Sequence, residues 1–328
     1  MTKLRLGIIG TNFISDQLCD AVRRTADFEL FAVLSRSAER GNFYATEQGI
    51  AHAYTDADEF FNSGIDAVYV ASPNSLHAEY SLGAVKSGLH VLCEKPTASN
   101  LEEYIKMRDA AREAKAVLLE AMRPAFDPAL AAVKNALPRI GRVRRASLEF
   151  CQYSSRYDKF RAGEILRAFD ITYSNAAVMD IGVYPIHFCL RLFGKPSGRI
   201  SSRSVILDNG FEGSGEVMLA YDGMTAVISY AKTFDSCTPS VIEGEDGAII
   251  IDKISAPTKL TLVLRGGERE DIPFEYSDNN MIFELKEFAR LIRCGEYINE
   301  HETYSEAELE IIDEVRRQNG VKFPADDS

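Results

Sequence analysis

The sequence lacks the features of several common protein classes. No stretch approaches the roughly 20 consecutive apolar residues of a membrane-spanning helix. Basic residues are outnumbered, since 37 Lys and Arg stand against 49 Asp and Glu and give a net charge of −12. The basic residues are scattered rather than gathered in a patch, and a negative chain repels nucleic acid and anionic membranes. We therefore expect no nucleic-acid partner and no membrane association.

Paired cysteines and metal-ligand spacings are also missing. The six cysteines form no C-x-x-C pair, and the five histidines are isolated from one another and from the cysteines. No metal site is therefore predicted. The first residues, "MTKLRLGIIG", run straight into a strand pattern with no signal-peptide region before it. These features predict free thiols and a cytoplasmic location.

The pattern of the first part, residues 1–122, alternates between strand and helix. The expected strands are Leu4–Ile9, Phe28–Ser35, Asp66–Ala71, Leu89–Cys93 and Ala116–Glu120. The expected helices are Ser15–Thr25, Ala38–Gln48, Leu76–Ser87 and Leu101–Ala114. Strand–helix alternation with nearly continuous apolar strands predicts a doubly wound parallel sheet, an α/β Rossmann domain. Ligands bind such sheets at the carboxyl ends of the strands.

The regular strand–helix alternation ends in the second part, residues 123–328. Helices are expected at Pro128–Leu137, Ser174–Phe193, Met281–Arg293 and Ser305–Gln318. Strands are expected in "RVRRASLEFCQYSS" and at Ser201–Leu207, Glu212–Tyr221, Thr225–Thr233, Ala248–Ile251 and Leu260–Leu264. Turns such as "YDGM" favour hairpins. The pattern predicts an α+β domain with an open, mostly antiparallel sheet. We expect substrate binding and oligomerisation to belong to this domain.

The first expected strand ends in "GIIGTNFIS". A dinucleotide fold requires glycine at the tight turn, glycine where the backbone nears the pyrophosphate, and a small residue where helix meets strand. Gly10 fills the first role, Asn12 stands at the second, and Ile14 or Ser15 falls near the third. Asn tolerates positive φ, so the turn remains possible. We predict cofactor contacts along Gly10, Thr11, Asn12, Phe13 and Ile14; an ordinary strand–helix turn is the alternative.

The second expected strand ends at Ser35, Arg36 and Ser37. An NAD-selective site would place an acidic residue there, whereas a guanidinium and two hydroxyls favour a 2′-phosphate. We therefore predict NADP, with NAD as a possible second cofactor. The alternative interpretation is a surface arginine.

Two further strand ends meet the same edge. The loop "ASPNSLH" carries Ala71, Ser72, Pro73, Asn74 and His77. Asn74 or Ser75 is a candidate cap of the next helix. His77 either packs there or contacts cofactor or substrate.

The segment "CEKP" ends the fourth expected strand. Lys95 points toward the cofactor edge, and Glu94 beside it is expected to orient or neutralise it. Because proline readily accepts a cis peptide bond, we predict a cis bond between Lys95 and Pro96. A lysine fixed in this way is a candidate proton donor.

Together "GIIGTNFIS", "ASPNSLH", "CEKPTASN" and "MDIGVYPIHF" resemble the glucose–fructose oxidoreductase and inositol dehydrogenase family, Gfo/Idh/MocA, over nearly the whole chain. The resemblance implies a Rossmann domain and an open-sheet domain. It also implies NAD or NADP and oxidation or reduction of sugars, polyols and related carbonyls. It makes Lys95 the catalytic lysine, with Asp180 and Tyr184 about 85 residues later. A tyrosine at position 184 resembles the pattern of the family branch that includes dihydrodiol dehydrogenase.

The remaining expectations concern this second site. Asp180 and Tyr184 are four apart, so a helix would put them on one face. An ammonium near Tyr184 would favour loss of the phenol proton. His187 is not at the family's histidine position. Relatives often have glycines where this chain has Asn175.

Arg123 is a candidate contact to cofactor or substrate. Tyr153, Arg156 and Tyr157 either select the substrate or form a solvated strand end.

We therefore expect an NAD(P)-dependent dehydrogenase or reductase. It would transfer hydride between nicotinamide and a carbinol or carbonyl carbon of a sugar, polyol or diol. The alternative is a non-catalytic sensor of the same fold, and an aromatic diol or a tetrapyrrole is a further substrate alternative. A homodimer or higher homo-oligomer is expected because the sheet of the second domain has a face that the remaining helices cannot cover.

Overall fold

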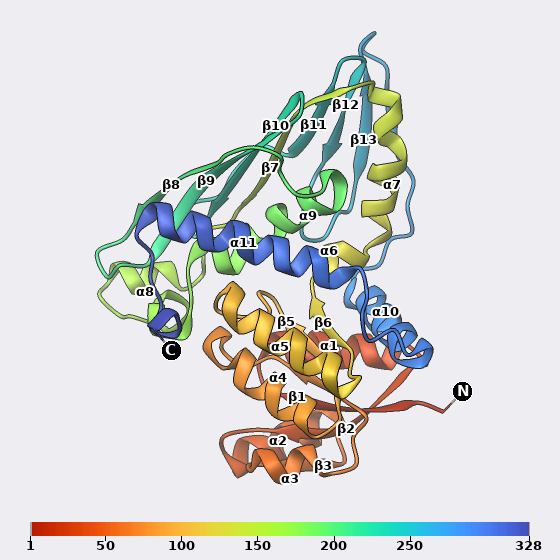
Figure 1. Cartoon of the computed structure of the whole chain (residues 1–328), viewed down its shortest axis with the longest axis vertical. Coiled ribbons are helices and arrows are strands. Elements are labelled where there is room, and N and C mark those ends of the chain that lie inside the picture. The colour runs from red at the N-terminus through yellow and green to blue at the C-terminus, as the bar shows by residue number, and fades with distance from the viewer. Residues whose placement is uncertain (1, 328) are drawn as a thin grey trace. The chain divides into compact units, whose positions relative to one another are not determined.

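The computed structural model describes residues 2–327, which form two compact units (Figure 1). The first unit extends to Ala121 and also includes Asp278–Glu306. The second contains Met122–Ser277 and the chain from Ala307 onward. The sequence-based division placed all residues after 122 in one domain, whereas 278–306 group with the first unit.

The first unit is built on a six-stranded sheet in the order β3-β2-β1-β4-β5-β6, in which every neighbouring pair is parallel. Its strands are β1 Leu4–Ile9, β2 Phe28–Leu34, β3 His52–Tyr54, β4 Ala67–Val70, β5 His90–Glu94 and β6 Leu118–Ala121. The predicted doubly wound α/β sheet is confirmed. β3 was not predicted, because three residues are too few for a recognisable pattern. All four residues of β4 are buried, as expected for a strand covered on both faces.

Helices cover this sheet, and one of them, α10, comes from residues 278–306. They are α1 Phe13–Arg24, α2 Ala38–Gln48, α3 Ala57–Phe61, α4 His77–Lys86, α5 Leu101–Ala114 and α10 Met281–Cys294. α4 and α5 pack side by side (Figure 1). The ring of Phe288 in α10 stacks on Phe28 of β2 at 5.7 Å, and Asp278 pairs with Arg24 at 2.5 Å. The amphipathic pattern of α10 predicted a helix but could not show which sheet it covers.

The second unit is built on an eight-stranded sheet in the order β14-β13-β12-β11-β7-β10-β9-β8. The strands are β7 Val143–Cys151, β8 Ile200–Ile206, β9 Glu212–Tyr221, β10 Met224–Ala231, β11 Ser240–Gly244, β12 Gly247–Ile251, β13 Leu260–Leu264 and β14 Arg269–Asp271. All pairs are antiparallel except β7 with β10. The predicted open, mostly antiparallel sheet is confirmed, and "YDGM" forms the β9–β10 hairpin.

The helices of the second unit are α6 Arg123–Phe126, α7 Pro128–Ala136, α8 Tyr157–Arg161, α9 Val183–Phe193 and the later part of α11, His301–Asn319. α9 lies against one face of the sheet and contacts β7 and β10 (Figure 1). In the described residues one helical segment, 171–193, is long and apolar enough to cross a membrane by length and composition. This corrects the expectation that no stretch approaches such a span. Because 78% of its most apolar window is buried inside the protein, core packing accounts for its composition.

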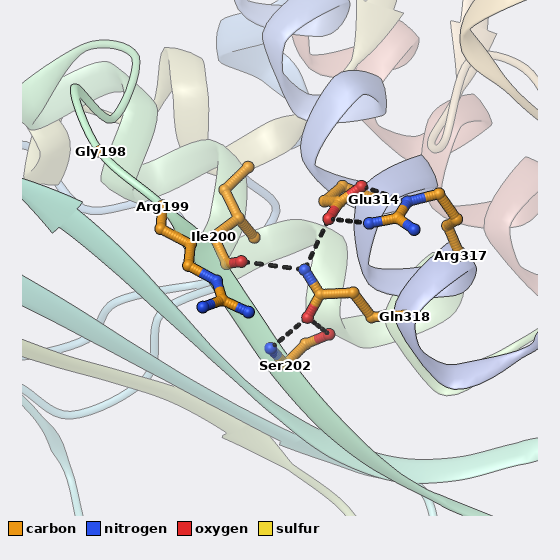
Figure 2. Close-up of a pocket in the computed structure, with 7 residues that line it drawn as sticks. All are labelled: Gly198, Arg199, Ile200, Ser202, Glu314, Arg317 and Gln318. Atoms are coloured by element: carbon orange, nitrogen blue, oxygen red, sulfur yellow. Dashed lines mark hydrogen bonds and ion pairs between the residues drawn. The ribbon is translucent and has the colours of Figure 1, made fainter.

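The end of α11 protects the edge strand β8. Gln318 donates to the carbonyl oxygen of Ile200 at 2.9 Å, and its own side-chain oxygen accepts from the backbone N–H and the hydroxyl of Ser202 (Figure 2). A shallow hollow beside these bonds is also lined by Arg199 and Arg317. These contacts occupy backbone groups that an exposed edge would offer to another strand. No predicted site residue lines this hollow.

Candidate active site

The turn after β1 requires a glycine. Gly10 has φ +107°, and a Cβ on it would lie 2.5 Å from the carbonyl oxygen of Ala71, just after β4. Any other side chain would therefore be strained by its backbone conformation and by this contact. A tight turn that only glycine can form is the feature that a dinucleotide fold requires at its first glycine. The residues present thus fit a dinucleotide.

Asn12 has a different role from the one suggested by the sequence. Its φ is −116°, so tolerance of positive φ does not explain its presence. Its side-chain oxygen accepts from the N–H groups of Ile14 (3.0 Å) and Ser15 (3.3 Å) and thereby caps α1. Its amide nitrogen donates to the carbonyl oxygen of Ala71 at 3.0 Å. Asn12 therefore ties the glycine turn to the end of β4. Phe13, the next residue, is 64% exposed.

The end of β2 presents two arginines rather than one. Ser35 is buried, Arg36 is exposed, and the Ser37 hydroxyl caps α2 by accepting from the Arg40 N–H at 3.4 Å. The guanidinium of Arg40 donates to the hydroxyl (2.6 Å) and to the carbonyl oxygen (2.5 Å) of Thr11. Arg40 therefore links this loop to the glycine turn. Arg40 was not predicted from the sequence, although a second arginine four residues after Arg36 was a usable signal.

His77 is a buried link between two loops. Its Nδ1 lies 2.9 Å from the carbonyl oxygen of Pro96 and its Nε2 lies 3.0 Å from that of Ser72. Burial lowers the pKa of His77 to about 4, although both carbonyls favour the charged form. The neutral ring carries one N–H, so it donates to one carbonyl at a time. His77 thus holds the "ASPN" loop against the turn that carries Lys95.

The start of α4 differs from the prediction. A 3₁₀ turn, Asn74–Leu76, precedes the helix, and Leu76 occupies the N-cap position without a side-chain cap. Neither Asn74 nor Ser75 is therefore the cap. Asn74 and Pro73 remain half-buried at the carboxyl edge of β4.

Lys95 stands at the carboxyl end of β5, and the predicted cis peptide bond between Lys95 and Pro96 is confirmed. Lys95 is half-buried, whereas Glu94 is buried. The Glu94 carboxylate accepts a short hydrogen bond from the Tyr69 hydroxyl on the neighbouring strand. It also accepts from the backbone N–H of Lys95 at 3.3 Å. Glu94 is therefore anchored to β4 and steadies the backbone at Lys95.

The predicted helix at Ser174–Phe193 contains a π turn, η5 Val178–Gly182, followed by α9. Before it, Ser174 has φ +57°, a strained conformation for a non-glycine residue. Gly182 allows a close approach, since a Cβ there would lie 2.9 Å from the ring of Tyr230 in β10. π turns are rare and often occur at functional sites. This one carries Asp180, whose side chain is 42% exposed.

Buried polar groups support the π turn. The Glu212 carboxylate accepts from the Val178 N–H (2.8 Å), the Tyr230 hydroxyl (2.8 Å) and the Ser204 hydroxyl (2.5 Å). Burial raises the pKa of Glu212, and the three donors oppose that shift. The first residue of the turn is therefore fixed from β9.

Asp180 pairs with a lysine that the sequence analysis missed. The ammonium of Lys232, just after β10, lies 2.6 Å from the Asp180 carboxylate. Tyr184 is buried in α9, and its ring lies 5.5 Å from that of Phe150. No local pattern marked Lys232, because it reads as the continuation of an expected strand.

The other expected substrate contacts lie near α8. The Tyr153 hydroxyl donates to Asp158 at 2.6 Å, and the Tyr157 ring stacks on Phe169 at 5.6 Å. Arg156 is exposed at the start of α8. Tyr157 is therefore anchored to a buried aromatic group.

Two further residues singled out from the sequence belong to the second unit. Arg123 begins α6 and is half-buried. The Asn175 side chain donates to the Arg167 carbonyl oxygen at 2.7 Å and so fixes the chain just before the π turn.

The predicted residues therefore form two groups. One surrounds Gly10 and Lys95 at the carboxyl edge of the first unit's sheet. The other surrounds Asp180 and Tyr184 in the second unit.

Comparisons with known proteins agree with these features. Residues 4–122 match the family described as an oxidoreductase family with an NAD-binding Rossmann fold, GFO_IDH_MocA. The chain is 42% identical over 326 residues to scyllo-inositol 2-dehydrogenase (NADP(+)) IolU of Bacillus subtilis, covering 98% of this chain and 99% of the relative. It is 29% identical to mouse trans-1,2-dihydrobenzene-1,2-diol dehydrogenase, covering 98% and 99%.

The fold is also found among solved structures. Aldose-aldose oxidoreductase from Caulobacter crescentus superposes with a TM-score of 0.85 at 21% identity, covering 97% of each chain. These relatives favour the oxidoreductase interpretation over that of a non-catalytic sensor. The chain belongs to the Gfo/Idh/MocA family of NAD(P)-dependent oxidoreductases.

Proposed function

We propose that the protein is an NADP-dependent dehydrogenase or reductase acting on a CH–OH group of a polyol, sugar or diol. The observation that carries the proposal is the place of Lys95. It directly follows β5, which β4 separates from β1 and the Gly10 turn in the sheet order. A strand-end lysine at the ligand edge of a dinucleotide-binding sheet is suited to exchange a proton with a substrate hydroxyl.

The cofactor would be held by the carboxyl edge of the first unit. The residues proposed to contact it are Gly10, Thr11, Asn12, Phe13, Ile14, Ser35, Arg36, Ser37, Ala71, Ser72, Pro73, Asn74, His77, Glu94, Lys95 and Arg123. Arg36 is proposed to bind the 2′-phosphate, because this exposed residue lies two positions after the end of β2. Arg40 would support the same region through Thr11. NADP is preferred on these grounds and because the relative from Bacillus subtilis is named an NADP(+) enzyme.

When bound, NADP supplies the hydride acceptor or donor. The protein's part is to hold the substrate and move its hydroxyl proton. Lys95 and Tyr184 are proposed to exchange that proton, and Asp180 to accept a hydrogen bond from the substrate. Tyr153 and Arg156 are proposed to select the substrate from the edge of this group.

The substrate class rests on the relatives. The names of the two similar dehydrogenases specify scyllo-inositol and a trans-dihydrobenzenediol, both ring compounds with vicinal hydroxyls. We propose a vicinal diol on a six-membered ring for this chain. The test is a panel of inositols, aldoses, acyclic polyols and cyclic diols scanned for NADP reduction and repeated with NAD. Turnover of acyclic polyols alone, or none with any compound, would contradict the proposal.

A homodimer formed through the outer face of the second unit's sheet is also proposed. Cross-strand partners lie on the same face of a sheet. One row of such partners, all at least partly exposed, crosses six strands and consists of Met218, Val227, Ser147, Val241, Ile250 and Thr261. Four of these are large and apolar, so a second copy is a suitable cover.

A cytoplasmic location is proposed as well. The six cysteines of the chain, all within residues 2–327, are free thiols. Free thiols are typical of a reducing compartment.

A further inference from the structure

Lys232 is a buried lysine whose ammonium contacts a carboxylate and a backbone carbonyl oxygen. The residue is only 5% exposed. Its ammonium lies 2.6 Å from the Asp180 carboxylate and donates to the carbonyl oxygen of Ala168 at 3.0 Å. Lysine is rarely buried without partners, because desolvating its charge is costly. A lysine in this position therefore requires a specific counter-charge.

Aromatic faces complete its surroundings. The ammonium lies 5.0 Å from the ring centroid of Phe169 and 5.4 Å from that of Phe211, both within cation–π range. The two rings pack against each other at 4.8 Å, and Phe160 stacks on Phe169 at 5.2 Å. The aromatic cluster therefore supplies two ring faces near the buried ammonium.

Lys232 and Asp180 differ in exposure, and the difference shows which of the two side chains is accessible to solvent. The Lys232 side chain is 6% exposed, whereas that of Asp180 is 42% exposed. The lysine therefore faces inward and the carboxylate faces partly outward. An ion pair built only for stability gains little from leaving one member accessible.

We infer that Lys232 is the positioning residue of Asp180, holding its carboxylate ionised and in one orientation so that it can accept a substrate hydroxyl. This inference rests on the proposed function, in which Asp180 contacts substrate. The pair acts with the Glu212 bond to Val178, which fixes the start of the same turn. Side-chain charge and backbone support thus fix Asp180 from two strands.

Other charged groups on the neighbouring elements have partners of their own. The Asp170 carboxylate accepts from Thr172, Asp235 accepts from the Tyr153 N–H, and Glu149 accepts from the Ser236 and Thr238 hydroxyls. The guanidinium of Arg167 lies 5.0 Å from the ring centroid of Tyr173. Arg144 and Arg145 of β7 pair with Glu245 and Glu243, and β9 carries Glu212 and Glu216. The Lys232 ammonium is a cation in direct contact with the Asp180 carboxylate.

The test compares Lys232→Met and Lys232→Gln with wild type on a confirmed substrate. Loss of the ammonium favours the protonated form of Asp180, so the acidic limb of the kcat/KM profile should move to higher pH. Turnover should fall by up to about 100-fold because the carboxylate is misplaced. NADPH affinity should stay within a few-fold. Lys232→Arg, which keeps the charge, should restore the acidic limb toward wild type.

Lys195→Met is the matched control, because Lys195 pairs with Glu310 at 2.8 Å in an exposed position. It should leave both the profile and turnover unchanged. If Lys232→Met does not fold, Lys232→Gln carries the same expectation. An unshifted acidic limb in the soluble variants would overturn the inference.

A second arm does not depend on activity. Unfolding midpoints of wild type, Lys232→Gln, Asp180→Asn and the double variant form a mutant cycle. The single changes should be strongly non-additive, since each removes the same pair. Additive shifts would overturn the pair itself. If the cycle shows coupling but no substrate is turned over, the proposed function fails while the ion pair stands.

Discussion

The carboxylate of Glu212 accepts a 2.8 Å hydrogen bond from the backbone N–H of Val178, the first residue of the π turn that carries Asp180. A buried acid in β9 thus fixes the start of the turn that carries this candidate site residue. Such supporting contacts hold a catalytic side chain in place more securely than the local chain can alone.

Replacing Glu212 with leucine should destabilise the protein. The change leaves the Val178 N–H and the Ser204 and Tyr230 hydroxyls without this acceptor, at about 1–3 kcal/mol per buried group. Urea unfolding should show a loss of several kcal/mol. Glu216→Leu is the control, because Glu216 is exposed on the same strand and should change stability little. Equal losses in both variants would show that the network contributes nothing specific.

Acid should destabilise the protein partly through His77. Its pKa is lowered to about 4 in the folded state, so the unfolded chain binds more protons between that value and about 6.5. Stability from this residue is therefore present above pH 6.5 and is lost as the pH falls toward 4. The full effect is about 3 kcal/mol. Thermal unfolding followed from pH 7 to pH 4 measures it.

The comparison variant is His77→Asn, which does not titrate. It should be less stable at pH 7 but should lose less stability on acidification than wild type. His52→Asn, at an exposed position, serves as the control. A pH slope in His77→Asn as steep as that of wild type would contradict the assignment.

Arg36 should determine the choice between the two cofactors. Arg36→Ala removes a charge-assisted contact worth about 1.5–3 kcal/mol, so the Michaelis constant for NADP should rise about 10- to 100-fold while that for NAD changes little. Arg40→Ala should raise both constants, because Arg40 holds Thr11 in the turn that both cofactors share. Steady-state kinetics with each cofactor measures this, with exposed Arg265→Ala as the control. Equal effects of Arg36→Ala on both cofactors would refute a role in reading the 2′-phosphate.

Light scattering at micromolar concentration should give twice the chain mass of 36.4 kDa. A charge in the exposed row of the sheet, Val227→Glu, should reduce the mass to that of one chain because it would be buried unpaired at the interface. Ile298→Glu, at a position 68% exposed in the first unit, should not. A single-chain mass for the wild type would exclude the dimer.

The sequence predicted both sheets because their patterns are local. Apolar strands alternating with amphipathic helices indicate a parallel sheet wherever they occur. The sequence did not show which of the two sheets α10 would pack against, since the apolar stripe of a helix can pack on any sheet. The π turn was also missed, because "VMDIGVYPIHF" has the composition of an ordinary helix. The π turn depends on contacts with residues distant in sequence. Glu212 accepts from the Val178 N–H, and Gly182 allows the close approach of Tyr230.

The candidate site residues were also chosen from local sequence patterns. Lys95 was selected as a candidate because a strand end, a proline and a family motif coincide in four residues. Lys232 was not found, because its partner Asp180 is distant in sequence and only the folded sheet brings them together. Asn12 was noticed for a conformation that it does not adopt, and its bond to Ala71, just after β4, joins residues that are distant in sequence.

The proton exchange proposed for Lys95 and Tyr184 gives the decisive prediction. Lys95→Met removes an ammonium, and Tyr184→Phe removes a hydroxyl. General acid–base help is worth about 100- to 10,000-fold in rate, so each change should lower kcat within that range while NADPH affinity, measured by fluorescence, stays within a few-fold. Because both groups act on one substrate hydroxyl, the double variant should be little slower than either single variant. Lys86→Met, at the end of α4, is the control and should retain wild-type turnover. Full turnover in Lys95→Met would instead make this lysine a structural residue beside Glu94, and the proton would have to leave by another group.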